Sequence, residues 1–287
     1  MAKPKLILFS DPKRPNASKA LEQFLNFVRD KAEILVNCLE GDCPTETLRK
    51  ADFAVVFGGD GTILGAARQL CETEVPVIGV NVGKLGFLAE FSVAELESLF
   101  DRIIKKGESA IEQRMVLRCK IRKHNNVEID AKAVNDVVIS AGSPFNMIEL
   151  QIAVNGQFLA GCIGDGLIVS TPTGSTAYNL SAGGPILTAD ISAIVLTPIC
   201  PHSLSFRPIL MDAGSRLKIQ ALRVNDDTTV MLDGHLRQRL SVNDEIIVER
   251  HPGKFLVVHN PLRTQWDTLA TKLKWAEKPR YADEKEK

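Results

Sequence analysis

The chain has 287 residues, of which 45% are hydrophobic and 24% are charged, as is usual for a folded globular protein and not for a disordered one. Lysine plus arginine and aspartate plus glutamate both number 35, so no overall charge favours nucleic-acid or anionic-membrane partners. No apolar run approaches the ~20 residues needed to span a bilayer. The N-terminal MAKPKLILFS has too short an apolar stretch for a signal peptide, and we expect a cytoplasmic protein.

The cysteines show neither a C-x-x-C pair nor a matching histidine spacing. Scattered cysteines in a reducing compartment behave as small hydrophobic side chains. Free buried thiols are therefore favoured over disulfides at Cys38, Cys43, Cys71, Cys119, Cys162 and Cys200.

Up to about residue 108, short apolar runs alternate with helical patterns, which is typical of a parallel sheet covered by helices. The predicted strands are KLILFS, EILVN, FAVVF and PVIGVN, at residues 5–10, 33–37, 53–57 and 76–81. The predicted helices cover residues 16–32, 45–51, the stretch after Gly61, and 92–107. In the last of these, Ser92 and Glu95 predict a capping box, and Gly107 predicts the helix end.

The pattern then changes to short strand-like runs rich in β-branched residues, separated by Gly, Asn, Asp or Pro. Asn155-Gly156 predicts a hairpin turn between two of them. The tail becomes helical again, with Trp266, Leu269 and Leu273 at helical spacing. We expect a Rossmann-like α/β domain over residues 1–108, completed by residues 262–287 as a helix that returns to it, and a β-rich, sandwich-like domain over residues 109–261.

The stretch AVVFGGDGTILGAARQL, residues 54–70, places Asp60 between glycines at the end of a predicted strand. Gly58, Gly59, Gly61 and Thr62 form a turn whose N–H groups and following helix dipole suit phosphate. A carboxylate repels phosphate, so its presence there fits metal binding or acceptance of a proton from an attacking hydroxyl. The structural alternative is a tight turn in which Asp60 caps the helix.

A second stretch, GDGLIVSTPTGSTAYNLSAGGP at residues 164–185, is dense in hydroxyl groups. Such a loop offers neutral donors for phosphate, ribose and amide groups. The alternative is a Ser/Thr-rich turn that satisfies its own backbone.

Together, GGDGT at 58–62, NDVV at 135–138, DGLIVSTPTGSTAYNLSAGGP at 165–185, LDG at 232–234 and WDTLATKLKW at 266–275 resemble the NAD kinase family in order and spacing. The resemblance covers about residues 20 to 280. GGDGT alone is shared with lipid kinases such as those acting on diacylglycerol and sphingosine, and more loosely with phosphofructokinases. The long Ser/Thr segment is what distinguishes NAD kinases.

The resemblance implies transfer of the terminal phosphate of ATP, or of another donor, to the 2′-hydroxyl of the adenosine ribose of NAD, which gives NADP. Asp60 would accept the hydroxyl proton, and magnesium, with no fixed protein ligand assigned, would shield the donor phosphates. The site would lie in the cleft between the domains. A homodimer or homotetramer is also implied, because the family builds its dinucleotide site from neighbouring subunits.

The resemblance further implies NAD-binding roles for a set of residues. Asn135 and Asp136 would bind the nicotinamide ribose, Asp165 the nicotinamide side, and Phe87 would lie over the adenine. Thr173 and the run Thr176, Ala177, Tyr178, Asn179, Leu180 and Ser181 would wrap the dinucleotide, with Asp60, Gly61 and His235 completing the set. Ordinary packing is the alternative for Phe87 and Tyr178.

Four positions depart from the family pattern. Asp136 is shorter than the usual glutamate, and Leu88 replaces an aromatic residue of some members. His235 stands where glutamine is common, and Ile163 where many members have a basic residue. The Ile163 change leaves the preference between NAD and NADH open. The remaining alternatives are a lipid kinase and a non-catalytic NAD(P)-binding sensor.

Overall fold

The structure is a computed structural model that describes residues 3–38, 43–83, 86–106, 111–123 and 128–275. The predicted helix end at Gly107, the predicted boundary between residues 108 and 109, and the end of the tail lie outside these residues. No helix of the described ranges is long and apolar enough to cross a membrane.

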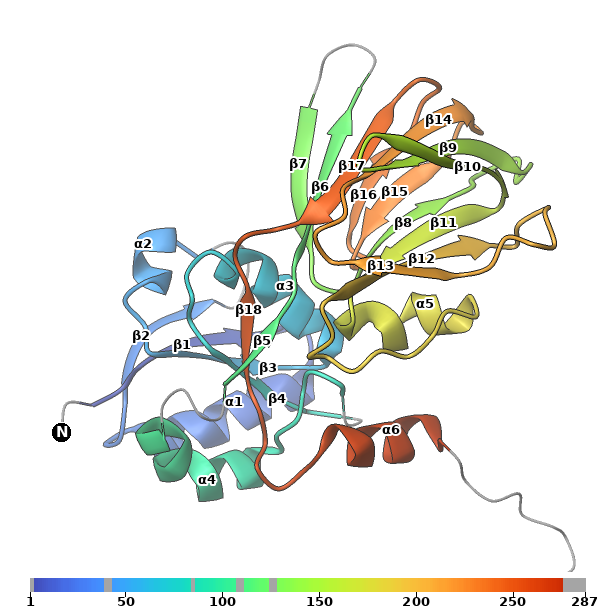
Figure 1. The fold of residues 1–287 in the computed structure, drawn as a ribbon. Helices are drawn as coiled ribbons and strands as arrows, with labels where there is room; N and C mark the ends of the chain where they lie inside the picture. Colours follow the sequence, from blue (N-terminus) through green and yellow to red (C-terminus); the bar gives the residue numbers. More distant parts are fainter. Residues whose placement is uncertain (1–2, 39–42, 84–85, 107–110, 124–127, 276–287) are drawn as a thin grey trace, which may run out of the picture.

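The first domain contains a six-stranded sheet in the order β2-β1-β3-β4-β18-β5 (Figure 1). All neighbouring pairs are parallel except β18 and β5, so the sheet is mixed at one edge. The strands are β1 Lys5–Ser10, β2 Glu33–Cys38, β3 Phe53–Phe57, β4 Val77–Val80, β5 Ile111–Arg114 and β18 Phe255–Val258.

Helices cover both faces of this sheet, which explains why its strands are apolar at consecutive positions. The helices are α1 Pro15–Val28, α2 Thr45–Leu48, α3 Asp60–Leu70 and α4 Val93–Lys106. Along β3, Val55 and Phe57 pack with α1 and α4, whereas Val56 packs with α3 on the opposite face. The predicted capping box at α4 is present, since the Ser92 and Glu95 side chains each bond the other residue's backbone N–H.

The second domain is a sandwich of two antiparallel six-stranded sheets, ordered β10-β9-β14-β17-β6-β7 and β13-β12-β11-β8-β15-β16. The largest apolar cluster lies between them, as expected for packed sheets. Its strands are β6 Leu117–Arg122, β7 Glu128–Ala133, β8 Asp136–Ser140, β9 Ile148–Val154, β10 Gln157–Gly164, β11 Gly166–Ser170, β12 Ala193–Ile199, β13 Ile209–Asp212, β14 Leu217–Arg223, β15 Thr229–Leu232, β16 Leu236–Arg239 and β17 Glu245–Arg250. Asn155 and Gly156, both with positive φ, join β9 to β10 as the predicted hairpin turn.

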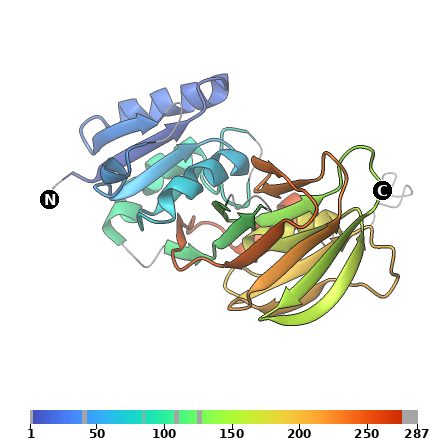
Figure 2. The ribbon, with the colours of Figure 1, turned by 90° about the horizontal axis from the view of Figure 1, so that it is seen from above.

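Helix α6, Gln265–Leu273, follows β18 and lies along the first domain (Figure 1). Arg263, just before the helix, pairs with Glu95 of α4 at 2.7 Å. The predicted architecture of an α/β domain, a β-rich domain and a returning C-terminal helix is confirmed, and Figure 2 shows the two domains side by side. β5 and β18 belong to the first sheet, although the predicted boundaries place their residues in the second domain, residues 109–261.

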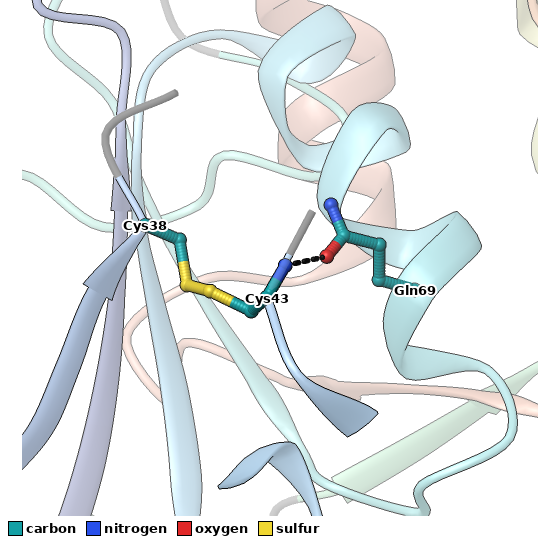
Figure 3. Close-up of a disulfide and its surroundings, with 3 residues drawn as sticks. All are labelled: Cys38, Cys43 and Gln69. Carbon is teal, nitrogen blue, oxygen red and sulfur yellow. Dashed lines mark hydrogen bonds between the residues drawn. A yellow bond between two sulfur atoms is a disulfide. The ribbon is translucent and has the colours of Figure 1, made fainter. Parts of the chain in front are cut away.

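The prediction of free buried thiols is wrong at three cysteines. Cys38, at the end of β2, and Cys43 form a disulfide, with Cα atoms 6.1 Å apart (Figure 3). A separation of five residues in the sequence does not reveal whether two cysteines approach each other, and here their Cα atoms lie within the range found for disulfides. Cys200 is free but exposed, whereas Cys71, Cys119 and Cys162 are free and buried as expected.

Candidate active site

Asp60 begins helix α3, directly after the glycines that follow β3. Its carboxylate accepts N–H groups from the loop before α4: Oδ2 from Phe87 at 2.9 Å, and Oδ1 from Leu88 at 2.9 Å and Ala89 at 3.1 Å. Gly86 permits this approach, because a Cβ there would lie 2.0 Å from Asp60 Oδ1. Asp60 is therefore fixed by a neighbouring loop and makes no side-chain cap on its own helix.

Lys272 of α6 also reaches this carboxylate. Its Nζ lies 3.5 Å from Asp60 Oδ2 and 4.6 Å from the centroid of the Phe87 ring. Both charged side chains are partly accessible, at 24% for Lys272 and 29% for Asp60. The site is thus open to a ligand.

Neighbours of Asp60 line two large cavities. The basic cavity, of about 920 Å³, is lined by Lys13, Arg14, Gly61, Thr62, Arg68 and His235, among others. The α6 cavity, of about 690 Å³, is lined by Phe87, Thr173, Thr176, residues 186–190 and α6, among others. Asp60 itself lines neither cavity, but the next residue, Gly61, lines the first, and Phe87, whose N–H donates to Asp60, lines the second.

The other members of the predicted phosphate turn differ in access. The Gly58 N–H is already bonded to the Val80 carbonyl at 2.9 Å. Gly59 lines a smaller cavity of about 540 Å³ that also contains Lys13 and Arg14. Lys13 and Arg14 therefore share a cavity with Gly61 and another with Gly59.

The Ser/Thr-rich segment divides into internal and cavity-facing hydroxyl groups. Thr171 Oγ1 donates to the Val134 carbonyl at 2.6 Å, and Ser175 Oγ donates to the Pro172 carbonyl at 2.6 Å. Thr173 and Thr176 instead line the α6 cavity. The self-bonded turn thus describes the first group, and the second group has hydroxyls at a cavity, although Thr176 Oγ1 also donates to the Thr173 carbonyl at 3.4 Å.

The short helix α5, Tyr178–Ser181, continues this segment. Tyr178 is 41% exposed, which contradicts core packing for its ring. Ala177 and Leu180 are half-buried and Ser181 is exposed. All four have some surface available to a ligand.

Asn179 differs from the other members of the predicted set of ligand contacts. It is fully buried, and its amide donates to the Ser175 and Pro185 carbonyls and accepts from the Thr197 hydroxyl. With all these positions used by protein atoms, Asn179 holds the segment in shape.

Asn135 and Asp136 lie at the start of β8, where they meet a residue that the sequence reasoning did not select. The Asp233 carboxylate accepts the N–H groups of Val134, Asn135 and Asp136, at 2.9, 2.7 and 3.2 Å. Burial raises the pKa of Asp233, and burial together with the Asp233 charge raises the pKa of Asp136 to about 7. The LDG motif was the signal that could have identified Asp233.

The Asn135 side chain is half-buried, and its Oδ1 accepts no hydrogen bond from the part of the chain that the structure describes. A buried acceptor without a partner is costly, so it is a natural place for a ligand donor.

His235 lies beside the phosphate turn. Its ring Cε1 would be 3.6 Å from a Cβ on Gly61, and both residues line the basic cavity. Nδ1 is 2.6 Å from the Asp233 carbonyl, which can only accept, so Nδ1 carries a proton. The histidine is exposed but engaged, and it faces the basic cavity.

Asp165 is separated from the other predicted residues. It is exposed and precedes β11, whose first residue pairs with Ser140 and whose last pairs with Asp136. At 3.3 Å per residue, the strand places Asp165 about 20 Å from the Ser/Thr-rich loop. Ile163, at 36% exposure, lies at the same distant end.

The described residues contain no group of three or more His, Cys, Asp or Glu side chains arranged to hold a metal ion. The Asp60 oxygens are also engaged by N–H groups. These residues therefore do not form a magnesium site of their own.

Comparisons with known proteins agree with this arrangement. Residues 12–109 match the family model described as the ATP-NAD kinase N-terminal domain, and residues 134–260 the ATP-NAD kinase C-terminal domain. The NAD kinase of Desulforamulus reducens is 39% identical over 246 residues, covering 85% of each chain. That of Magnetococcus marinus is 37% identical and covers 93% of this chain and 91% of its own.

Among solved structures, yeast NADH kinase complexed with NADH has a TM-score of 0.86 at 28% identity, covering 98% of this chain and 90% of that one. An NAD kinase from Archaeoglobus fulgidus in complex with ATP has a TM-score of 0.75 at 25% identity, covering 94% of this chain and 98% of that one. Three findings agree: the resemblance of the five motifs, the two matched domains and the relatives that cover most of the chain. The chain therefore belongs to the NAD kinase family of phosphotransferases.

Proposed function

We propose that Asp60 accepts the 2′-hydroxyl proton of the adenosine ribose of NAD while the terminal phosphate of ATP moves onto that hydroxyl. The observation that carries this is that neighbours of Asp60 line both cavities: Gly61 lines the basic cavity, and Phe87, whose N–H Asp60 accepts, lines the α6 cavity. One substrate in each cavity would bring donor and acceptor together at the carboxylate. A base positioned in this way contributes roughly 10²–10⁴-fold to the rate.

The basic cavity suits the phosphates of ATP. Lys13, Arg14 and Arg68 supply positive charge, and the start of α3 adds the positive end of a helix dipole. Magnesium would arrive with the phosphates and shield their charge, since it is commonly held by phosphates and water with few protein ligands. The relative solved with ATP supports ATP as the donor.

The α6 cavity suits the acceptor. Phe87 offers an aromatic face for a base, and Thr173 and Thr176 offer hydroxyl groups for the ribose and phosphates. Of the two Asp60 oxygens, Oδ1 already accepts two backbone N–H groups and Oδ2 only one. The acceptor hydroxyl would therefore approach Oδ2.

An endpoint assay with ATP, magnesium and either NAD or NADH tests this function, with NADP detected by an NADP-specific dehydrogenase. The NADH product is oxidised before detection, so both arms use one readout. We expect product from NAD, and the NADH arm measures the selectivity that Ile163 left open. Binding of NAD without turnover indicates a sensor instead, and turnover only with diacylglycerol vesicles indicates a lipid kinase.

We further propose that Asp165 acts in the site of a neighbouring copy within a homodimer or homotetramer. Its distance from the Ser/Thr-rich loop supports this, as do exposed apolar side chains on the same domain, such as Phe158 at 69% and Leu204 at 85%. Mixing inactive Asp60→Asn and Asp165→Asn chains tests it, because a shared site regains activity in mixed oligomers. Two inactive variants that stay inactive after denaturation and joint refolding contradict it.

A cytoplasmic location also stays part of the proposal. The Cys38–Cys43 disulfide argues against this location, because disulfides are rare in a reducing cytosol.

A further inference from the structure

Lys272 belongs to the WDTLATKLKW motif, to which the sequence reasoning gave no chemical role. It lies in the last turn of α6, with its ammonium beside Asp60 Oδ2 and over the Phe87 ring. These are the oxygen and the ring that the proposed function assigns to the acceptor hydroxyl and the adenine. The ammonium therefore stands where the two substrates exchange the phosphoryl group.

The structure holds Lys272 at this place by fixing the start of its helix. The Thr264 and Asp267 side chains form a capping box, and Arg263 pairs with Glu95. Asn260 bonds Glu90 through both its backbone and its side chain, at 2.9 and 3.0 Å. These contacts bind the segment before α6 to the first domain, which orients the helix along the site.

The contact between Lys272 and Asp60 leaves the ammonium free to turn. Its 3.5 Å separation is at the long limit of a hydrogen bond, and both side chains are partly exposed. A lysine ammonium carries three donors on a flexible stem. It can therefore keep one donor toward Asp60 and aim another at an oxygen that arrives on the acceptor.

Charge gives the reason for a cation here. The reaction places a phosphate group, with a charge of about −1.5 to −2 at pH 7, on an oxygen next to the Asp60 carboxylate. Once Asp60 has released the accepted proton, its carboxylate and the 2′-phosphate are two like charges close together, which disfavours the product. A cation within reach of both relieves that repulsion.

Resting on the proposed function, we propose that Lys272 is a further catalytic residue, whose ammonium pairs with the phosphoryl group as it moves onto the 2′-oxygen and then with the 2′-phosphate of NADP. The bond from the donor's bridging oxygen to the terminal phosphorus breaks, and the bond from the 2′-oxygen to that phosphorus forms. The hydroxyl proton goes to Asp60, and Lys272 keeps its own protons throughout.

The test compares Lys272→Met with Lys272→Arg and with the control Lys19→Met, an exposed lysine on α1 that lines none of the three cavities. Removing one stabilising donor from a transition state commonly costs on the order of 10²-fold in kcat. We expect that loss in Lys272→Met, with KM for NAD changed less than threefold or so, partial rescue by arginine, and no change in the control.

Binding gives a second readout that a purely structural role does not move. NADP differs from NAD by the 2′-phosphate. Lys272→Met should therefore weaken the binding of NADP by about tenfold or more, in line with the loss of a charged partner, and leave the affinity for NAD nearly unchanged. If Lys272→Met does not fold, Lys272→Gln carries the same comparison. Equal losses for NAD and NADP, or unchanged kcat, overturn the role of Lys272. Absence of NADP formation by the unmodified chain overturns the proposed function instead.

Discussion

The substitution Asp60→Asn tests the centre of the mechanism, and the structure shows that it does more than remove a base. Asparagine keeps the shape of aspartate but exchanges one acceptor oxygen for an NH₂ donor. In this chain Oδ1 faces the N–H groups of Leu88 and Ala89, and Oδ2 faces the N–H of Phe87. Whichever way the amide turns, its NH₂ points at a backbone donor.

The magnitude follows from the better of the two orientations. If the amide oxygen faces Leu88 and Ala89, only the Phe87 N–H loses its acceptor, at a cost of about 1–3 kcal/mol in the free energy of unfolding. We expect the lower half of that range, because Asp60 is 29% exposed and water can reach the site. Loss of the partly exposed ion pair with Lys272 adds less than about 1 kcal/mol. Turnover should fall much further, by roughly 10²–10⁴-fold.

Three measurements separate these effects: kcat from NADP formation, NAD affinity by calorimetry, and the free energy of unfolding from urea titration. The control is Asp130→Asn, which makes the same chemical change on β7 and loses a surface ion pair with Arg118. We expect normal turnover in the control. We also expect nearly normal NAD affinity in Asp60→Asn, since in the better orientation the amide NH₂ stands at the Oδ2 position and can donate to the oxygen of the hydroxyl.

Turnover within a few-fold of the unmodified chain refutes the role of Asp60 as proton acceptor and leaves it a structural one. A loss of NAD affinity as large as the loss of kcat also contradicts the mechanism, because Asp60 would then act in binding.

Three more predictions follow from the coordinates. Gly86→Ala should lower turnover at least tenfold because its Cβ would meet the catalytic carboxylate, whereas Gly83→Ala, with no atom within 4 Å of its Cβ, should not, as NADP formation will show. The pKa of Asp136 is raised to about 7, so its contribution to stability is present at low pH and lost as pH rises from 4 to 8. Urea titration should therefore show that the free energy of unfolding of Asp136→Asn exceeds that of the unmodified chain by about 1–3 kcal/mol at pH 8 and by little at pH 4. An equal difference at both pH values contradicts this. Thiol titration in denaturant should give four free thiols with the Cys38–Cys43 disulfide formed, against six after reduction, and reduction should cost at most about 2 kcal/mol for so short a loop.

The sequence predicted the elements with local signals and missed what depends on distant pairing. Capping residues identified the start of α4, and Asn155-Gly156 identified a hairpin, because both signals act within a few residues. The placement of β5 and β18 in the first sheet has no local signal, since a strand's partners lie far away along the chain. The disulfide was missed for the same reason.

The site shows the same division at the level of single side chains. The motifs identified Asp60 and the Ser/Thr-rich loop, but they did not show which hydroxyls face the cavity. They also did not show that the Asn179 side chain bonds Ser175, Pro185 and Thr197 inside the protein. A motif records that a residue type is required and leaves open whether the requirement is chemical or structural. Buried partners separate the two cases: the Asn179 amide uses both N–H donors and its oxygen within the protein, whereas the buried oxygen of Asn135 lacks a donor among the described residues.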